Sequence, residues 1–338
     1  MQVTTLKDVA NQAGLSVQTV SRILNGDNKE VWPSSIRRAD KVRAIAKKMN
    51  FRPSATARTM RSKKTRMVGV LIRNTADIPH TAPTNYEIIL GIYHHLENAG
   101  YEICLVHQSD IGKRSRIFRE KMLDGLIVIG DMQPAMIQEI RETFNQCVWV
   151  DVNVYESQYC IQRDEYAAGR MVGDKVLEAG YDQLIWLTRV RNEGVSHYSA
   201  VNRFKGFEDA INSVDRPIDL RSVYVDDQTI AELDSVLGAI TPQTAVVTSG
   251  ATGGPLMVNW AMSKGLMPGR DFGLATPDDC LSLHEIDSGI SRVHFDRLAM
   301  GQQAGKMLLD QMASMSATST MMPVRWIEGF TLGLTARQ

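Results

Sequence analysis

The stretch Thr5-Leu-Lys-Asp-Val-Ala-Asn-Gln-Ala-Gly-Leu-Ser-Val-Gln-Thr-Val-Ser-Arg-Ile-Leu-Asn25 carries the signals of two short helices. Thr5 and Asp8 have the spacing of a capping box at the start of a helix. Gly14 is suited to end that helix in the left-handed conformation, and Ser16 is suited to cap a second one. Two short helices joined by a three-residue turn that contains glycine predict a helix-turn-helix.

A third helix is expected to close a small core over this pair. It follows Pro33, and its apolar residues recur at helical spacing. These residues are Ile36, Ala39, Val42, Ile45, Ala46 and Met49. The second helix is expected to turn Val20, Ile23 and Leu24 inward. Ala10 and Gly14 are small enough to let the first two helices approach closely.

The outward face of the second helix carries side chains that suit DNA. Gln18 and Arg22 lie four residues apart, and such side chains can pair bidentately with adenine and with guanine in the major groove. Nearby hydroxyl and amide groups suit phosphates, and phosphate contacts position a protein without specifying sequence. The candidate DNA-binding residues here are Thr5, Ser16, Val17, Gln18, Thr19, Ser21, Arg22 and Asn25. The alternative is that a short amphipathic helix pair shows this pattern by chance. The caps, the turn and the outward donors, however, all indicate a DNA-binding helix-turn-helix.

Length and charge fit a DNA-binding protein with more than one domain. The chain has 338 residues, with 38 Lys and Arg against 38 Asp and Glu. The zero net charge conceals a split, because residues 1–66 hold 15 basic and four acidic residues, a formal charge of +11, and residues 67–338 carry −11. The split predicts a basic module for a polyanion on an acidic body, although a solvated basic face would show the same charge.

The sequence shows no targeting or membrane segment. No apolar run approaches the roughly 18 residues that span a membrane, and the first residues lack the apolar core of a signal peptide. We therefore expect a cytoplasmic protein without a membrane partner. The four cysteines are not spaced as metal ligands, so we expect reduced thiols and neither a metal nor a cofactor.

The periodicity changes at Met67, where short β-rich runs begin to alternate with helical stretches. Strands are predicted at 67–72, 102–107, 125–129, 146–150, 184–187, 223–225, 245–248 and 272–275, and helices at 86–99, 114–123, 167–179, 201–211 and 257–264. This alternation predicts parallel doubly wound sheets, and eight strands fit two sheets better than one. Ligands of such folds bind beyond the carboxyl ends of the strands, here in a cleft between two lobes.

Residues 4–72 resemble the N-terminal part of the LacI/GalR family of bacterial transcription regulators. The stretch 5–25 is close to the signature of that family along its whole length. The loop 26–32 departs from the family because it is longer than usual. The body resembles, less specifically, the family's periplasmic-binding-protein-like effector domain. The matching stretches are 123–127, 164–165 followed by Gly169, 203–207, 278–279 and 328–330.

The resemblance implies three parts. Residues 1–53 would form an all-α helix-turn-helix headpiece, residues 54–66 a hinge helix and linker, and residues 67–338 an α/β body of two doubly wound lobes for effector binding and dimerisation. In the family the hinge helix folds on DNA and wedges apolar side chains into the minor groove. Ala57 and Met60 occupy the matching positions, and Arg58 could contact phosphate. A plain basic linker is the alternative.

The resemblance also implies an effector site. Arg203 of the R-x-x-G-F stretch would hold a polar group of the ligand, and the Asp278-Asp279 pair would accept its hydroxyls or amines. The candidate effector-binding residues are Thr84, Asn85, Ser199, Arg203, Ser249, Asp278 and Asp279. A salt bridge between the arginine and an aspartate across the cleft, or helix capping by the aspartates, is the alternative. The family's stacking aromatics are replaced here, so we expect a compact polar effector.

The sequence therefore predicts a sequence-specific DNA-binding transcription regulator, a repressor by the commoner family outcome, under allosteric control by a small polar effector. One headpiece buries too little DNA for tight binding, so we expect a homodimer on a near-palindromic double-stranded operator. A solute-binding protein of a transporter would not need the helix-turn-helix. A sugar-modifying enzyme would need an acid/base pair at plausible spacing, which the sequence lacks, so we expect no enzyme.

Overall fold

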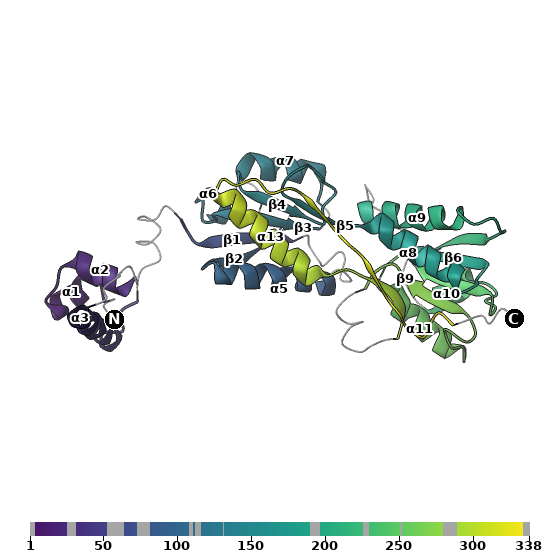
Figure 1. Cartoon of the computed structure of the whole chain (residues 1–338), viewed down its shortest axis with the longest axis horizontal. Helices are drawn as coiled ribbons and strands as arrows, with labels where there is room; N and C mark the ends of the chain where they lie inside the picture. The colour runs from purple at the N-terminus through teal and green to yellow at the C-terminus, as the bar shows by residue number, and fades with distance from the viewer. Residues whose placement is uncertain are drawn as a thin grey trace. The chain divides into compact units, whose positions relative to one another are not determined.

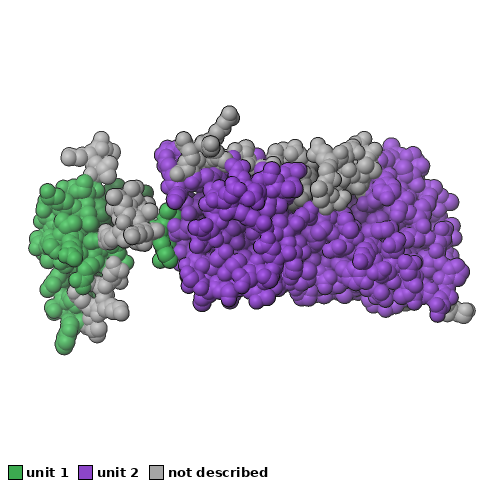
Figure 2. Space-filling view, turned by 90° about the horizontal axis from the view of Figure 1, so that it is seen from above, with its two compact units in different colours: residues 1–66 green, residues 67–338 purple. Residues whose placement is uncertain are grey.

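The computed structural model describes residues 4–25, 32–52, 64–72, 82–107, 111, 116–130, 132–189, 197–225, 230–250, 252–279 and 289–333. The chain divides into two compact units, residues 1–66 and residues 67–338 (Figure 1, Figure 2). Each unit has a hydrophobic core of its own. The two units are therefore described separately.

The first unit is a three-helix headpiece with α1 at Leu6–Ala13, α2 at Val17–Leu24 and α3 at Pro33–Lys48. The amide of Asp8 donates to Thr5 Oγ1 at 3.3 Å, and the amide of Thr5 donates to the Asp8 carboxylate at 2.8 Å, which completes a capping box. Gly14 follows α1 with a left-handed φ of +65°. The predicted helix-turn-helix is confirmed.

The headpiece core corrects two expectations. Its buried residues are Val9, Ala10, Val20, Ile23, Ala39, Val42 and Ala46. Ile36 is 48% exposed, because the inward face of α3 passes through Ser35 and Ala39 and leaves Ile36 about 100° away from it. A Cβ at Gly14 would meet no atom within 4 Å, so its left-handed backbone, and not close helix approach, explains the glycine.

The second unit consists of two lobes, each built around a six-stranded sheet (Figure 1). In the first lobe the order is β11-β5-β4-β3-β1-β2 and all neighbours are parallel. Its strands are β1 Met67–Ile72, β2 Glu102–His107, β3 Gly125–Ile129, β4 Cys147–Val150, β5 Cys160–Arg163 and β11 Thr320–Met322. Its helices are α5 Ala82–Asn98, α6 Arg116–Arg119, α7 Pro134–Thr143 and α13 Arg297–Met312.

The second lobe has the strand order β12-β10-β9-β8-β6-β7, in which only β12 runs antiparallel to its neighbour. Its strands are β6 Gln183–Arg189, β7 Asp219–Val225, β8 Thr244–Thr248, β9 Gly273–Thr276, β10 Ser291–His294 and β12 Arg325–Ile327. Its helices are α8 Glu165–Glu178, α9 Tyr198–Ile211, α10 Ile230–Val236 and α11 Gly253–Ser263. The predicted pair of doubly wound lobes is confirmed.

The chain passes between the lobes three times. It crosses between β5 and α8, returns between β10 and α13, and crosses again between β11 and β12. The first crossing joins the last residue of a first-lobe strand to the first turn of a second-lobe helix. Polar residues at these crossings and at the carboxyl ends of the strands therefore come together between the lobes.

Several elements differ from the prediction. The strands β5, β10, β11 and β12 are missing from it, because they have only three or four residues and too little periodicity to detect. The helix predicted at 114–123 ends at Arg119, since Lys121 adopts a left-handed φ of +49°. Within the described residues, no helix is long and apolar enough to cross a membrane.

Candidate functional site

The second helix of the headpiece presents most of the predicted DNA-binding residues to solvent. Gln18, Arg22 and Asn25 are exposed, as are Thr5, Ser16 and Val17, and Thr19 is half-buried. Ser16 starts the helix by accepting the amide of Thr19 at 3.1 Å. Two side chains with base-reading geometry therefore lie four residues apart on the exposed side of a capped helix.

The predicted exposure of Ser21 is wrong. It is predicted on the outward face, but it is only 8% exposed, and its hydroxyl accepts from the Asn25 side chain at 3.3 Å. It follows Val20 and lies on the border of the face that packs on the core, so little of its side chain faces solvent. The hinge predictions, Ala57, Arg58 and Met60, lie outside the described residues.

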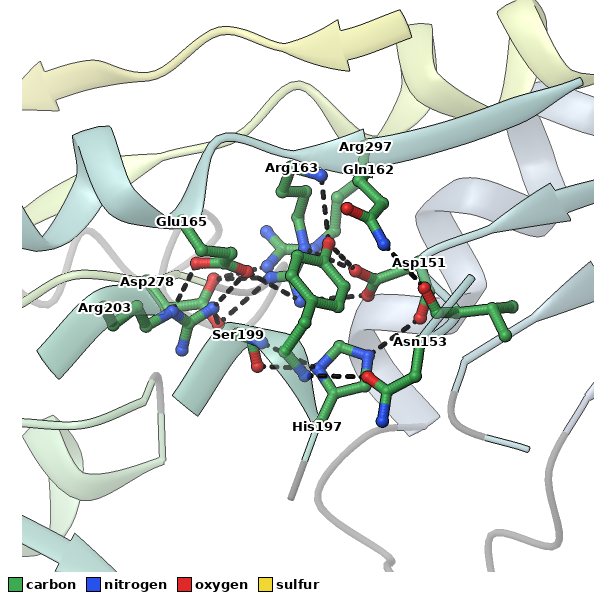
Figure 3. A network of polar contacts seen from close by, with 12 residues as sticks. Asp151, Asn153, Gln162, Arg163, Glu165, His197, Ser199, Arg203, Asp278 and Arg297 are labelled. Atoms are coloured by element: carbon green, nitrogen blue, oxygen red, sulfur yellow. Dashed lines mark hydrogen bonds and ion pairs between the residues drawn. The ribbon is translucent and has the colours of Figure 1, made fainter. Parts of the chain in front are cut away.

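In the body, a buried ionic network joins the facing ends of the two lobes (Figure 3). Arg163, the last residue of β5, donates two hydrogen bonds to the carboxylate of Asp151, at 2.9 and 3.2 Å. It also forms ion pairs with Glu165 at 3.0 Å and with Asp278 at 3.3 Å. One first-lobe guanidinium is thus bound to an acid of its own lobe and to two acids of the second lobe.

Arg203 of α9 forms the second part of the network. It pairs with both carboxylate oxygens of Glu165, with one contact at 2.8 Å, and with Asp278 at 2.6 Å. Its remaining nitrogen donates to the carbonyl oxygen of Ser249 at 2.9 Å. The salt bridge between Arg203 and Asp278, left open by the sequence as an alternative to ligand binding, is present in this structure.

Arg297, the first residue of α13, completes the network. It bonds to the carboxylates of Asp278 and Asp279, the latter at 2.9 Å, and its side chain is 1% exposed. His294 of β10 contacts the other oxygen of Asp279 at 2.6 Å. Both aspartates follow β9, so they lie at the carboxyl edge of the second-lobe sheet.

Neighbouring charges shift the pKa values of these groups. Burial by itself raises the pKa of Asp278, but Arg203, Arg297 and Arg163 outweigh burial and hold that pKa far below its usual range. Burial likewise opposes the charge on Arg163, yet three neighbouring carboxylates raise its pKa well above its usual value. Asp278 and Arg163 are therefore ionised around neutral pH.

Asp151 and Asn153 also join the lobes through hydrogen bonds with the start of α9. The hydroxyl of Tyr198, at the start of α9, donates to the carboxylate of Asp151 at 2.5 Å, and the ring of His197 donates from Nε2 to the carbonyl oxygen of Asp151 at 2.8 Å. The amide of Tyr198 donates to Asn153 at 2.7 Å. Asp151 adopts a left-handed φ of +57°, a conformation that aspartate tolerates better than most residues.

Close packing of α8 on α9 sets the positions of Glu165 and Arg203. A Cβ at Gly169 would lie 1.9 Å from the carbonyl oxygen of Arg203, and a Cβ at Gly206 would lie 2.1 Å from that of Tyr166. Only glycine allows this contact between the helix backbones. These two glycines therefore allow the close contact of α8 and α9 that positions Glu165 and Arg203.

The remaining predicted effector residues fall partly within this region. Ser199 is half-buried, and its hydroxyl contacts Nδ1 of His197 at 2.7 Å. Asn85 lies half-buried on α5 and is not among the residues that the network joins. Thr84 is also on α5, but its side chain lies outside the described part of the chain.

Sequence reasoning missed Asp151, Arg163, Tyr198, His294 and Arg297. Asp151 could have been found, because it directly follows the predicted strand 146–150 and so lies at a carboxyl end. Arg163 could not, since its strand was not detected. The clusters of His, Cys, Asp and Glu among described residues include none with the geometry of a metal site.

Comparison with known proteins agrees with this architecture. Residues 5–54 match the family described as "Bacterial regulatory proteins, lacI family". The chain is 26% identical over 324 residues to the transcriptional repressor PurR of Pectobacterium carotovorum, covering 92% of this chain and 91% of the relative. It is 34% identical over 146 residues to catabolite control protein A of Staphylococcus xylosus, covering 42% and 41% of the two chains.

Solved structures show the same fold. The lac repressor dimer bound to operator and the anti-inducer ONPF superposes with a TM-score of 0.78 at 19% identity, over 98% of this chain and all of the other. A complex of the regulator CelR with cellobiose gives a TM-score of 0.61 at 18% identity, over 97% of this chain and 99% of the other. The two-unit architecture is therefore that of known regulators.

A capped helix-turn-helix unit and a two-lobed α/β body together define the class of DNA-binding transcription regulators. Within that class, the headpiece signature and the near full-length similarity to PurR identify the family. The chain belongs to the LacI/GalR family of bacterial transcription regulators.

Proposed function

We propose that this regulator is a homodimeric repressor that binds a near-palindromic operator. A small polar effector that binds between the lobes would lower or raise its affinity for that operator. The observation that carries the proposal is the exposed, capped helix α2 with Gln18 and Arg22 on one side. Gln18 and Arg22 would read base edges. Ser16, Thr19 and Asn25 would contact phosphates, with Val17 against a thymine methyl.

Exposed apolar side chains support the dimer. Strand β2 lies at one edge of the first-lobe sheet, where Leu105 is 56% exposed, and an unpaired edge of this kind invites pairing with another chain. The adjacent helix α5 exposes Tyr86 by 55% and Tyr93 by 37%. A two-fold partner covering this face would bring two headpieces to two half-sites.

The effector site is proposed where the lobes meet, at Arg203 and the Asp278-Asp279 pair. The network there contains ionic bonds between groups of different lobes, so a ligand that favours one lobe arrangement changes their number. By linkage, such a ligand changes operator affinity by the same factor that operator DNA changes ligand affinity. This coupling is the regulatory mechanism we propose.

Operator binding tests the proposal. Gel shifts of the full chain on DNA from upstream of its own gene should give a specific complex. Gln18→Ala and Arg22→Ala should each lose about 10- to 100-fold in affinity, corresponding to about 1–3 kcal/mol at one base position. Arg270→Ala, at an exposed ion pair of the second lobe, is the control and should bind as the parent does.

Wild-type binding by both α2 variants would contradict the assignment of the recognition helix. The position of each defect within the site gives a second check, because loss of a base contact relaxes specificity at one base pair, whereas loss of a phosphate contact weakens binding to all sequences alike.

A further inference from the structure

The carboxylate of Asp278 lies in a cradle of three guanidinium groups from three elements (Figure 3). Arg203 contacts it at 2.6 Å, Arg163 at 3.3 Å, and Arg297 through a further bond. The side chains of these arginines are 5, 8 and 1% exposed. Because the guanidinium fork matches the two oxygens of a carboxylate, the cradle is shaped for one such group.

Other contacts hold the cradle in position without Asp278. The guanidinium carbons of Arg163 and Arg297 both lie over the ring of Phe295, at 5.1 and 5.7 Å from its centroid. Arg163 is bound by Asp151, and Arg203 is bound by Glu165. Arg297 is also bound by Asp279 at 2.9 Å. If the carboxylate of Asp278 withdrew, the three buried guanidinium groups would keep these partners but lose an acceptor that they share, and a new carboxylate would restore it.

Motion between the lobes would expose this place. Asp278 and Asp279 follow strand β9 of the second lobe, whereas Arg163 ends β5 and Arg297 begins α13 in the first lobe. Moving the lobes apart would therefore separate Arg297 from both aspartates and Arg163 from one. Among the network residues described, the first lobe would then present the guanidinium groups of Arg163 and Arg297 against one carboxylate, that of Asp151.

We propose that the effector is a small carboxylic acid, whose carboxylate replaces that of Asp278 on Arg163 and Arg297. This inference rests on the proposed function, because it takes the contact between the lobes as the effector site. The group that the cradle now holds is itself a planar carboxylate, which favours a carboxylic acid over a tetrahedral phosphate. A neutral sugar or a free purine base has no group for this exchange.

Chemical rescue tests the cradle directly. Asp278→Gly removes the whole resident side chain, whose size is that of acetate, and acetamide has nearly the same shape as acetate without the charge. Acetate should raise the unfolding temperature of the full-length variant by about 3 °C at about ten times its dissociation constant, relative to chloride at equal ionic strength. Acetamide should not. Asp234→Ala, which removes a surface carboxylate paired with Lys264, should show no preference for acetate.

Equal effects of acetate and acetamide on Asp278→Gly would overturn the proposal. If the variant is recovered unfolded, the yield of folded protein after dilution from urea into acetate or acetamide gives the same comparison. Operator binding distinguishes a failure of the proposed repressor function from a failure of the carboxylic-acid proposal. Failure of the wild-type chain to bind operator overturns the repressor function while leaving acetate rescue intact, whereas an effector found to be neutral overturns only this inference.

Discussion

Asp151 shows how one residue joins the lobes and makes their contact depend on its charge. Its carboxylate accepts hydrogen bonds from Arg163 of the first lobe and from Tyr198 of the second. Burial by itself raises the pKa of Asp151, but Arg163, His197 and the hydrogen bond from Tyr198 outweigh burial and lower the pKa to about 2. The carboxylate is therefore ionised in the folded chain at pH values where it is protonated in the unfolded chain.

This shift predicts a defined loss of stability in acid. Because the folded pKa of Asp151 is below the unfolded value of 3.8, its stabilisation is complete above about pH 4 and is lost as the pH falls toward 2. At neutral pH, Asp151→Asn should destabilise the body by about 3–5 kcal/mol, because it leaves Arg163 short of a buried partner. Between pH 4 and 2 the gap to wild type should narrow by about 2 kcal/mol.

Urea unfolding of both proteins at a series of pH values measures this gap. Other carboxylates titrate in both proteins, so their contributions cancel in the difference. Parallel stability curves for wild type and Asp151→Asn across this range would show that the charge of Asp151 does not stabilise the body.

At the scale of the element, helix α2 was the best-predicted part of the chain, and the short strands were the worst. Thr5, Gly14 and Ser16 bond to residues four or fewer positions away, so local sequence was enough to find them. Strand β5 has four residues and is defined by pairing with β4 and with β11, in which Thr320 pairs with Ile161, 159 residues earlier in the chain. Arg163 and its contacts depend on that pairing, so no local pattern revealed them.

The same difference explains the effector site. The family resemblance of the sequence implied that Arg203 and Asp278 belong to one effector site. It did not show that Arg163 and Arg297 occupy the same space, because their positions follow from two crossings between lobes. Whether a charged pair is open to a ligand or already bound by other side chains is a property of the packing, and the structure shows the second arrangement.

The cap of α2 allows its structural role to be separated from DNA contact. Ser16→Ala should lose about 1 kcal/mol of helix stability, whereas Ser16→Asp should keep it, since aspartate is an equally good cap. Both should weaken operator binding, and aspartate more strongly, because it places a negative charge near phosphate. Amide hydrogen exchange of α2 in the full chain and gel shifts measure the two effects.

Two outcomes would count against this separation of roles at Ser16. Fast exchange of α2 in Ser16→Asp would mean that aspartate does not replace the cap. Wild-type operator affinity in the same variant would mean that this position lies away from the DNA backbone.

The contact between α8 and α9 gives a prediction at the same scale. Gly169→Ala places a methyl group 1.9 Å from the carbonyl oxygen of Arg203, so the two helices must separate. We expect a loss of about 1–3 kcal/mol in urea unfolding, together with displacement of Arg203 from Glu165. Gly254→Ala is the matched control, because the new methyl meets only side-chain atoms of Ile290, at 3.1 and 3.6 Å, and no backbone atom within 4 Å.

The control should be neutral or slightly stabilising, since alanine is the better helix former. If Gly169→Ala were equally harmless, the close contact of α8 and α9 would not be needed to position the arginine.

At the scale of the whole molecule, the charge split gives each unit a separate role toward DNA. The headpiece and linker carry +11 and the body carries −11, so the attraction to phosphate is confined to the first 66 residues. Operator affinity should therefore fall steeply with salt, as it does wherever basic groups displace counterions. A body that repels DNA also leaves its own exposed faces for contacts with protein.

The opposite edges of the first-lobe sheet test where the second copy binds. Leu105 on β2 is 56% exposed at one edge, and Met321 on β11 is 43% exposed at the other. If the second copy binds at the β2 edge, Leu105→Lys should convert the dimer to monomer in analytical ultracentrifugation, because the interface would desolvate the new charge. Met321→Lys introduces the same charge at the opposite edge of this sheet and should leave the dimer intact.

Operator binding should follow the oligomeric state. A monomer contacts one half-site, so Leu105→Lys should bind the full operator no better than a single half-site, while Met321→Lys should bind it as wild type does. A dimer that survives Leu105→Lys, with full operator affinity, would exclude β2 from the dimer interface. A dimer lost only in Met321→Lys would place the interface at the β11 edge.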